Sequence, residues 1–500
     1  MITAKELELC KAQAQFQKMC EFLRQAADEG QRLDQVERGL FPQAMEMCLR
    51  MLQAFVEAHG DGDEGPELAH AGRTLRRLEQ PHDKRYLSIF GELLISRYVY
   101  GTREGQTQEC KPLDAALGLP EGDNSYVLED WLQRLCVKEA YGAAVEDLRA
   151  WLGTTVSVRT AEGMNRDMAQ YSEGYRLSQG LPPPEEDAEI LVTSGDGKGV
   201  PMRRTLEARL VAEGLRPPPA VDAGESDADE TARVGKKQMA YVGAVYSIAP
   251  YVRTAEQVLD EVCRRQRAAD RPPPVQKHLW AQMTRLEEGE VWPAAPLLFI
   301  AMAVECHERD PARKKTWVCL MDGERQLWKL QEEWFSRAIG ILDLFHALKR
   351  LWKVAHCFHA EESPEARAFV THHLQLLLEG KVGYVLRHFR QLLPKLKGEK
   401  QKTLASVITY YENNQEHMRY DEYLSAGYPI ASGVIEGACH HFVKDRMEQA
   451  GMRWELEGAQ AMLSLRAIFL NGQWDAFLTY RIAKEQQRLY GEPAQATLAA

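Results

Sequence analysis

The stretch Ala188-Glu-Ile-Leu-Val-Thr-Ser-Gly-Asp196-Gly-Lys-Gly199 decides the fold class of the central part of the chain. Its apolar half, 189–193, predicts a short buried strand. The glycines predict a sharp turn that aims Asp196 outward from the end of that strand. A plain Asx turn is equally consistent with the residues. The spacing matches neither the Walker phosphate loop nor the dinucleotide Gly-x-Gly-x-x-Gly pattern, which disfavours a nucleotide-binding enzyme.

Two more acids occupy comparable positions. Asp322 closes the apolar run Trp317-Val-Cys-Leu-Met321, and Glu436 lies near the start of a predicted helix. Each acid alone also fits a surface turn or a solvated helix face. Acids at two strand ends and on one helix can converge, and convergent carboxylates bind a hard divalent cation beside a phosphodiester. The three together therefore predict metal-dependent nucleic-acid strand chemistry.

Further polar residues flank these acids along the chain. Asp343 is placed to cap a helix whose first turn carries His346, and the pair is suited to binding a phosphate or a displaced base, or to positioning the metal site. Glu436, His440 and Lys444 recur at a spacing of four, which puts them on one helix face. An amphipathic helix with a solvated face is the alternative for this second group.

Alternating strands and helices predict an α/β core. Strands are expected at 239–248, 316–321 and 339–342, and helices at 254–268, 275–288 and 294–308. The chain is expected to divide into six regions. The first three are a helical region suited to dimerisation (1–60), a small strand-containing region (61–120) and a helix-turn-helix region (121–180). The last three are the first part of the core (186–345, with a flexible acidic insertion at 205–235), an all-helical insertion (346–425), and a C-terminal catalytic helix with a helical tail (426–500).

The helix-turn-helix is predicted from two helices, 140–152 and 157–168, on either side of a tight turn. Gly153 is suited to end the first helix and Ser157 to cap the second. The second helix would carry Arg159 and Arg166 toward DNA. An ordinary helical hairpin explains the same pattern equally well.

Composition sets broad limits on the class of protein. The 500 residues, 45% hydrophobic and 27% charged, are typical of a soluble protein of two to four domains. The amino terminus lacks the apolar region of a signal peptide and no run is long enough to span a membrane, so a cytoplasmic protein is expected. The net charge is −11, but seven Lys or Arg residues fall between Lys381 and Lys402 with one acid, Glu399. The charges are therefore segregated, which allows a basic DNA-binding surface.

Several motifs in this order resemble the ISKra-type transposases of bacterial insertion sequences, which are related to Mutator-like transposases. The resemblance covers about residue 85 to residue 480. Its motifs are Gly195-Asp-Gly-Lys-Gly-Val-Pro-Met, Val242-Gly-Ala-Val-Tyr, Asp322-Gly-Glu-Arg, Asp343-Leu-Phe-His-Ala-Leu-Lys-Arg-Leu-Trp, Ser432-Gly-Val-Ile-Glu-Gly-Ala-Cys and Val443-Lys-Asp-Arg-Met-Glu-Gln-Ala-Gly-Met-Arg-Trp.

The resemblance implies an RNase H-like core in which Asp196, Asp322 and Glu436 form an Asp-Asp-Glu triad that binds two Mg²⁺ or Mn²⁺ ions. Asp343 and His346 resemble the Cys/Asp-x-x-His element of Mutator-like and hAT transposases. The implied partners are the terminal inverted repeats, target DNA and further copies of the chain, with no membrane and a nucleoid-associated, cytoplasmic location in bacteria. Besides Lys198, beside the triad, the expected DNA-contacting residues are Arg159, Arg166, Arg203, Lys381, Arg387, Arg390, Lys395, Lys397, Lys444, Arg446 and Arg453.

The chain departs from the family at one position. Related chains often carry a Cys-x-x-Cys zinc ribbon ahead of the helix-turn-helix, whereas 100–117 holds only Cys110. Two alternatives to a transposase remain. One is an RNase H-like metal-dependent nuclease without strand transfer, and the other is a non-catalytic DNA-binding protein derived from a transposase.

Overall fold

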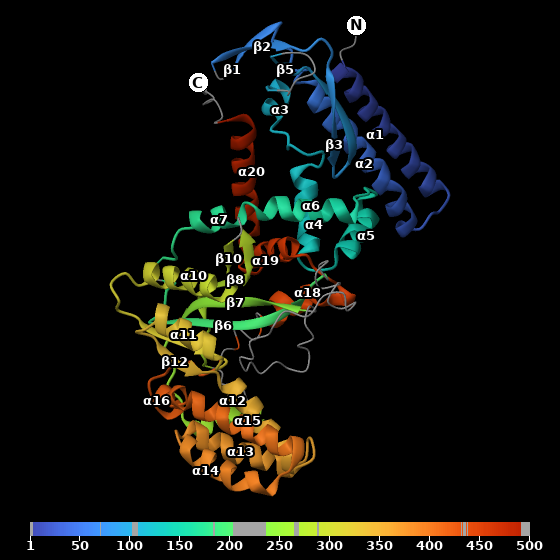
Figure 1. Ribbon diagram of the computed structural model, residues 1–500. Helices are drawn as coiled ribbons and strands as arrows, with labels where there is room; N and C mark the ends of the chain where they lie inside the picture. The colour runs from blue at the N-terminus through green and yellow to red at the C-terminus, as the bar shows by residue number, and fades with distance from the viewer. Residues whose placement is uncertain are drawn as a thin grey trace, which may run out of the picture. The chain divides into compact units, whose positions relative to one another are not determined.

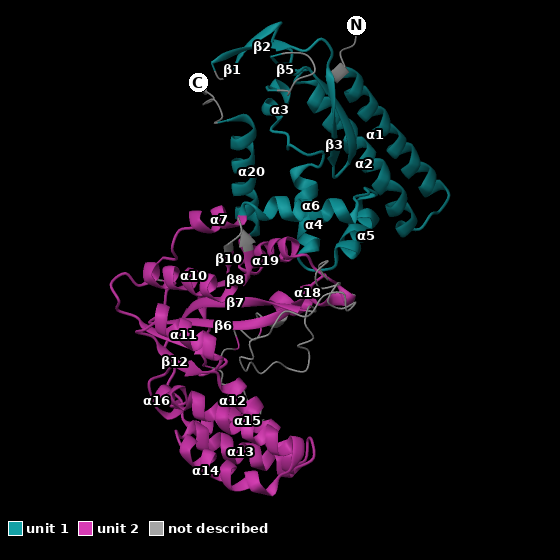
Figure 2. Ribbon diagram, in the orientation of Figure 1, with its two compact units in different colours: residues 1–171, 474–500 teal, residues 172–473 magenta. Residues whose placement is uncertain are grey.

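The structure is a computed structural model in which the chain forms two compact units. Residues 1–171 and 474–500 make up unit 1, and residues 172–473 make up unit 2 (Figure 2). We describe each unit by itself. The residues described are 4–70, 72–102, 109–183, 186–203, 237–264, 270–287, 290–431, 433, 437 and 439–491. Within these ranges, no helix has the length and apolar character needed to cross a membrane.

Unit 1 begins with an antiparallel helical hairpin packed on small β-sheets (Figure 1). Val56 in the second helix packs with Leu93 and Ile95 in a core that also contains Leu113 and Leu119. Strands are present in the region 61–120, as expected, and two of them, 82–88 and 91–97, pair as an antiparallel hairpin. The elements are α1 (Ala4–Asp28), α2 (Leu33–Glu57), β1 (Glu67–His70), β2 (Arg73–Arg77), β3 (His82–Ser88), β4 (Gly91–Arg97), β5 (Tyr100–Gly101) and α3 (Pro112–Leu117).

Three helices follow in unit 1: α4 (Tyr126–Cys136), α5 (Tyr141–Leu152) and α6 (Val158–Ala169). Gly153 ends α5 with a φ of 69°, and the Ser157 side chain accepts a hydrogen bond from the Thr160 N–H. Both caps are those that the sequence predicts. Leu148 and Val156 are buried at the turn. A tight, capped helix pair is therefore present at the expected position, and its role in binding DNA stays a proposal.

The C-terminal helix α20 (Trp474–Tyr490) belongs to unit 1, although the sequence pattern groups it with the preceding segment. Its Arg481 is buried and pairs with Glu129 of α4 at 2.5 Å and with Glu485 at 3.1 Å. Removing one partner of such a pair leaves a buried charge uncompensated. These ion pairs join α20, near the end of the chain, to α4, although the two helices are far apart in the sequence.

Unit 2 is built on a five-stranded mixed sheet in the order β12-β11-β6-β7-β8. β6 and β7 pair antiparallel, as do β7 and β8, whereas β11 and β12 run parallel to β6. The protein is therefore mixed α/β in this unit. The strands are β6 (Ile190–Pro201), β7 (Lys237–Ile248), β8 (Val275–Met283), β11 (Thr316–Met321) and β12 (Ile339–Leu342), with a small hairpin of β9 (Arg285–Glu287) and β10 (Glu290–Trp292).

One face of this sheet is covered by α10 (Ala294–Arg309). A side chain added at Gly243 would place its Cβ 2.8 Å from both Leu298 and Met302, so the glycine lets the helix pack directly on the strands. Unit 2 also contains α7 (Ser172–Ser178), α9 (Ala255–Arg264), α11 (Arg325–Trp334) and α19 (Leu456–Leu470).

The expected helix at 275–288 is wrong, because this segment forms the edge strand β8 and then β9. The side-chain amides of Gln460 in α19 and of Asn471 at its end form hydrogen bonds with the backbone of β8, where a further strand would otherwise pair. Asn471 accepts from the Leu279 N–H at 2.9 Å and donates to the Leu279 carbonyl at 3.1 Å. Gln460 accepts from the Met283 N–H and donates to the Ala281 carbonyl. These long-range bonds stabilise the strand and cannot be read from local periodicity.

An all-helical segment follows β12, as the sequence predicts, and gathers at one end of unit 2 (Figure 1). Its longer helices are α12 (Leu344–Phe358), α13 (Pro364–Leu378), α14 (Val382–Leu392) and α15 (Gly398–Asn414), followed by α16 (Tyr420–Ser425). The chain then returns to the sheet through a π-helical segment η4 (Cys439–Lys444), α18 (Asp445–Met447) and α19.

A histidine pair links α13 and α14, in which His373 is buried and His388 is half-buried. The His373 Nδ1–H donates to the Phe369 carbonyl at 2.7 Å, so its Nε2 accepts from the His388 Nδ1–H at 2.8 Å. Burial lowers the pKa of His373 to about 4. Protonation would put two N–H groups in opposition, because both nitrogens of His373 would then be donors.

This pair predicts acid sensitivity of the helical segment. The unfolded chain binds the proton at the ordinary histidine pKa, so stability falls as the pH drops from about 6.5 toward 4, by at most about 3 kcal/mol. Urea unfolding followed by circular dichroism at several pH values measures this fall in the free energy of unfolding. In His373→Leu the fall should shrink, whereas the exposed neighbour His372→Leu should keep it. An unchanged pH profile in His373→Leu would contradict the assignment.

Candidate active site

The structure brings Asp196 and Asp322 together on neighbouring parallel strands. Gly195 of β6 is the register partner of Met321, the last residue of β11. The next residue on each strand is an aspartate, and adjacent strands lie about 4.8 Å apart. Residues opposite one another on neighbouring strands share a face, so both carboxylates project from the same side of the sheet.

The expected turn at the glycines is wrong. β6 continues without a break to Pro201, and Asp196 lies within the strand rather than at its end. Gly195, Gly197 and Gly199 alternate with Asp196 and therefore face the opposite side. A Cβ at Gly197 would lie 2.8 Å from the Met239 side chain, so the glycine provides space beside the neighbouring strand rather than a bend.

The two aspartates form a strongly acidic site. Burial, and then the charge of Asp196, raise the pKa of Asp322. Glu324, two residues further on, has its pKa raised to about 6 by burial, by Asp322 and by Asp196. The three carboxylates thus repel one another at neutral pH, a condition that a bound divalent cation relieves. Glu324 was not predicted as a site residue, although it stands in the quoted Asp322-Gly-Glu-Arg motif.

Asp343 and His346 lie beside this acidic site. The Asp343 carboxylate caps α12, accepting from the N–H of Phe345 at 2.7 Å and of His346 at 3.2 Å. The Asp343 N–H donates to the Met321 carbonyl at 2.8 Å, which fixes the start of α12 at the end of β11. A positive charge on His346 would lower the pKa of Asp322, so this side chain lies within electrostatic range of that acid.

Two residues of the helical segment, Tyr410 and Arg350, hold the Asp322 loop. Neither was predicted as a site residue, although Arg350 stands in the quoted motif that begins at Asp343. The Tyr410 hydroxyl donates to the Asp322 backbone carbonyl, and the Arg350 guanidinium lies 4.4 Å from the centre of the Tyr410 ring. Gly323 has a φ of 91°, and a Cβ there would lie 2.9 Å from the Tyr410 hydroxyl. The loop is therefore shaped by α12 and α15 from outside the sheet.

Glu436, the third expected acid, lies outside the described residues, as does the side chain of His440. The segments on both sides of it contact the site's elements. The Ile430 carbonyl accepts from the Leu344 N–H at 2.9 Å, and η4 packs against β6. Within the ranges that the structure describes, no group of three His, Cys, Asp or Glu side chains is arranged to hold a metal ion.

The donor atoms that are present fit a hard cation. Asp196 and Asp322 supply carboxylate oxygens from a partly buried, negatively charged edge, which suits Mg²⁺ or Mn²⁺ better than softer ions. Asp196 Oδ1 accepts from the Gly197 N–H and Asp322 Oδ1 from the Glu324 N–H. These bonds fix the orientation of both carboxylates. Among the residues that the structure describes, no backbone N–H donates to the second oxygen of either carboxylate.

The expected DNA-contacting residues do not form one continuous group. Lys198 is two residues from Asp196 and shares its face, and Arg203 pairs with Glu455 at 2.8 Å near the end of β6. Lys444 and Arg453 are exposed in the same unit. The phosphate contact expected for Arg446 does not fit the structure, because this side chain is 0% exposed and its guanidinium lies 4.9 Å from the Trp454 ring centre.

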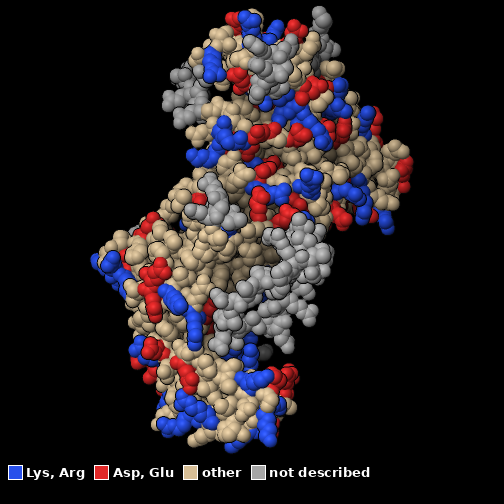
Figure 3. Space-filling view, viewed as in Figure 1, with Lys and Arg blue, Asp and Glu red and all other residues tan. Residues whose placement is uncertain are grey.

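The basic stretch on the helical segment is exposed but partly neutralised. Lys381 pairs with Glu379 at 2.7 Å, and Arg390 pairs with Glu412 at 2.5 Å. Arg387 packs over Tyr384. Acidic and basic side chains are interspersed on the face drawn in Figure 3. The remaining expected residues are Lys395, Lys397 and Arg159, all exposed, and Arg166, half-buried on α6.

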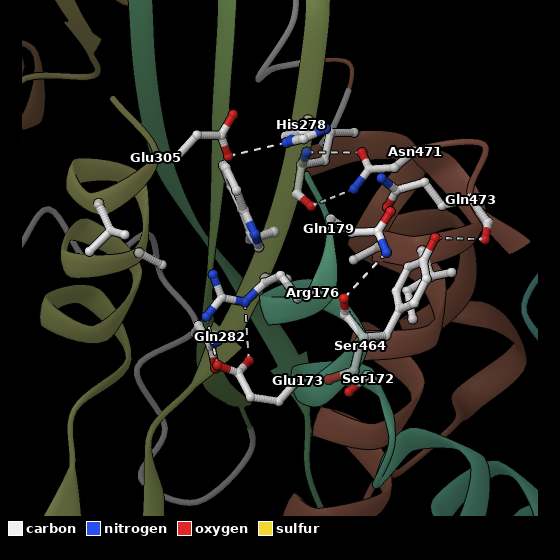
Figure 4. Close-up of a pocket in the computed structure, with 18 of the residues that line it drawn as sticks. Ser172, Glu173, Arg176, Gln179, His278, Gln282, Glu305, Ser464, Asn471 and Gln473 are labelled. Atoms are coloured by element: carbon white, nitrogen blue, oxygen red, sulfur yellow. Dashed lines mark hydrogen bonds and ion pairs between the residues drawn. The ribbon is translucent and has the colours of Figure 1, made fainter. Parts of the chain in front are cut away.

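A separate cavity of about 120 Å³ lies among α7, β8, α10 and α19 (Figure 4). Its wall contains the ion pair of Glu173 with Arg176 at 2.6 Å and a contact between the Glu305 carboxylate and His278 Nδ1 at 3.1 Å. Neither aspartate of the acidic site lines it.

No family model matches the chain, and no curated protein matches it.

Proposed function

We propose that this protein is a DDE transposase of the ISKra type, which cleaves transposon-end DNA with divalent metal and joins the end to target DNA. One observation carries the proposal. Asp196 and Asp322 each directly follow one member of the register pair of Gly195 with Met321 on adjacent parallel strands. Burial and the charge of Asp196 raise the pKa of Asp322. Two partly buried, mutually repelling carboxylates on one face of the sheet are costly to the fold, so a role in binding a cation explains their presence.

The order of the strands supports an RNase H-like core for this proposal. The first three strands of the sheet are antiparallel neighbours, and the fourth and fifth lie parallel to the first on its other side. In an RNase H-like core the first acid lies on the first strand and the second acid follows the fourth strand. Asp196 on β6 and Asp322 after β11 have these positions. The helical segment between β12 and η4 corresponds to the insertion that the resemblance implies.

Each part of the proposed site has a chemical task. Asp196, Asp322 and Glu436 would hold Mg²⁺ or Mn²⁺, two ions in all, which when bound activate the attacking hydroxyl and stabilise the departing oxygen. Lys198 is placed to bind a phosphate on the same face of the sheet. Tyr410 keeps the Asp322 loop in one position, which preserves the orientation of the carboxylate.

DNA and further copies of the chain are the proposed partners. The capped helix pair α5–α6, with Arg159 exposed, is suited to reading terminal inverted repeats. The exposed Lys444 and Arg453 would contact flanking phosphates. Within bacteria we propose a cytoplasmic, nucleoid-associated protein.

A strand-transfer assay tests the function. The full chain is incubated with Mg²⁺, a pre-nicked duplex carrying the element's terminal repeat, and a supercoiled target plasmid. We expect joined products that disappear with EDTA, since the 3′-hydroxyl attacks the target directly. Hydrolysis without joining would instead identify an RNase H-like nuclease, and end binding without either reaction would identify a non-catalytic DNA-binding protein. Both of these results overturn the proposal.

A further inference from the structure

The cavity among α7, β8, α10 and α19 lies apart from the acidic site and is lined by residues of unit 2 (Figure 4). Its volume of about 120 Å³ is that of roughly ten water molecules, since one water needs about 10–15 Å³ of such space. A small molecule of fewer than about ten non-hydrogen atoms therefore fits. Neither Asp196 nor Asp322 lines the cavity, so a ligand here is independent of the proposed catalytic function.

Three side chains of β8 form one wall of the cavity. Trp280 is the register partner of Gly243 on β7, and Gly243 faces α10. Trp280 therefore points toward α10, and His278 and Gln282, two residues away on either side, share this face. The rings of His278 and Trp280 lie edge to face with their centroids 6.0 Å apart. This wall thus presents an imidazole, an indole and an amide in a row.

The two polar groups of this row offer hydrogen-bond acceptors. The His278 Nδ1–H donates to the Glu305 carboxylate at 3.1 Å, so the Nε2 of the same ring is an acceptor. The Gln282 Oε1 is a buried acceptor. Among the residues that the structure describes, none donates to either atom. An unsatisfied buried acceptor is costly, and a ligand that donates to it removes this cost.

The charges around the cavity favour a cation. Its lining contains three glutamates and one arginine, which are Glu173, Glu305, Glu308 and Arg176. The Nε and the Nη2 of Arg176 both donate to the Glu173 carboxylate, at 3.2 Å and 2.6 Å. Glu308 is exposed and forms no ion pair with a described residue. The lining therefore offers acceptors and negative charge, which complement a cation rich in N–H donors.

Carboxylates lie toward both ends of the row. Glu305 contacts His278 at one end. The ion pair that Glu173 forms on α7, and then the charge of Arg285, lower the pKa of Glu173. Because Arg285 follows Gln282 by three residues, Glu173 belongs to the Gln282 end, and Figure 4 draws the side chains in this arrangement. Each end thus combines a neutral acceptor with a carboxylate.

The spacing of the row fits a short linear molecule. His278 and Gln282 are four residues apart on a strand, which corresponds to about 13 Å. One hydrogen bond of about 3 Å at each end leaves about 7 Å between the two donor atoms of a ligand. Two nitrogens joined by five methylenes span a similar distance, since each of the six bonds advances the chain by about 1.25 Å. Trp280 lies midway, and Ala301 and Val304 of α10 add apolar surface for the methylenes.

We propose that the cavity binds a linear diamine of about five methylenes, with one ammonium group at each end of the row. One ammonium donates to His278 Nε2 beside Glu305, and the other donates to Gln282 Oε1 beside Glu173. The methylenes lie along Trp280. An ammonium group carries three donors and no acceptor, which matches a lining of acceptors, and a cation near an aromatic ring is stabilised further. Such a molecule has about seven non-hydrogen atoms, which the cavity admits.

Isothermal titration calorimetry of the full chain with 1,5-diaminopentane at neutral pH tests the proposal. We expect one molecule to bind per chain with a Kd below about 1 mM, which is within reach of a ligand of this size. 1-Aminopentane lacks the second ammonium and should bind at least about tenfold more weakly. 5-Aminopentanoate carries a carboxylate in place of one ammonium and should not bind, because that carboxylate would face the glutamates.

Two variants and a matched control locate the binding site. Gln282→Leu removes the buried acceptor and Glu308→Lys reverses a charge of the lining, so each should weaken binding at least about tenfold. Glu333→Lys makes the same change of charge at an exposed position of α11 that does not line the cavity, and it should keep the wild-type affinity. Since Glu308 is exposed, its variant keeps the test decisive if Gln282→Leu does not fold.

Four results overturn the proposal. They are a wild-type chain that does not bind the diamine at about 10 mM, equal affinity for 1-aminopentane, unchanged affinity in either folded cavity variant, and an equal loss in Glu333→Lys. The last result would mean that the diamine responds only to the overall charge of the chain. Circular dichroism establishes that each variant is folded.

Discussion

We expect Asp322→Asn to reduce metal-dependent cleavage of transposon-end DNA by about a thousandfold or more, with the fold retained. The amide keeps the shape of the side chain but removes the charge that holds the cation, and a thousandfold loss corresponds to about 4 kcal/mol of transition-state stabilisation. A cleavage assay on a labelled end in Mg²⁺ measures the effect. Asp421→Asn is the matched control, since Asp421 is an exposed aspartate on α16 of the same unit.

The same variant should be no less stable than wild type at pH 8 without metal. Burial and Asp196 raise the pKa of Asp322 in the folded chain. Such a carboxyl stabilises the fold at low pH, and that contribution is lost as the pH rises through the folded pKa. Asparagine carries no charge and avoids this loss. Retention of more than about a tenth of the activity in a folded variant would rule out Asp322 as a metal ligand.

We expect Glu436→Gln to match Asp322→Asn in its loss of cleavage, whereas Glu324→Gln should stay within about tenfold of wild type. Both variants remove a glutamate charge, so each controls for the other. Glu324 lies near the two aspartates, and burial together with their charges raises its pKa to about 6, but the resemblance does not assign it to the triad. Glu436 is the acid that the resemblance assigns to the triad.

The opposite ranking of the two variants would contradict the triad assignment. Cleavage by both variants is measured at pH 8, where Glu324 is ionised, across a range of Mg²⁺ concentrations. If Glu324→Gln lost a thousandfold while Glu436→Gln remained active, the third metal ligand would be Glu324 and the triad assignment would be wrong. Folding of both variants is checked by thermal unfolding.

Local signals predicted much of the architecture. The apolar run 189–193 predicted a strand, and Gly153 with Ser157 predicted two helix ends, because each depends on residues close in sequence. Nothing local could predict that β6 continues through its glycines, since their space is filled from β7. The strand β8 was predicted as a helix for the same reason, because its bonds come from β7 and α19.

The site was predicted in part. The sequence singled out Asp196 and Asp322, but their register across two strands is a tertiary property. Tyr410 acts from a helix far along the chain from both aspartates, so no motif indicated it. Arg350 stands in the quoted motif that begins at Asp343, but its contact with the Tyr410 ring is a tertiary property. Arg446 was expected to contact DNA, and its burial against Trp454 does not fit that expectation, because the contact with Trp454 depends on the tertiary fold.

The side-chain amides on the outer edge of β8 also bear on how the chain is synthesised. Gln460 is 177 residues beyond Met283, and Asn471 is 192 residues beyond Leu279. During translation, the edge of β8 leaves the ribosome long before its partners exist. For that interval it is an open template onto which another nascent chain can add a strand. Fragments that end before α19 should therefore form intermolecular sheets and precipitate, even when they contain both aspartates of the site.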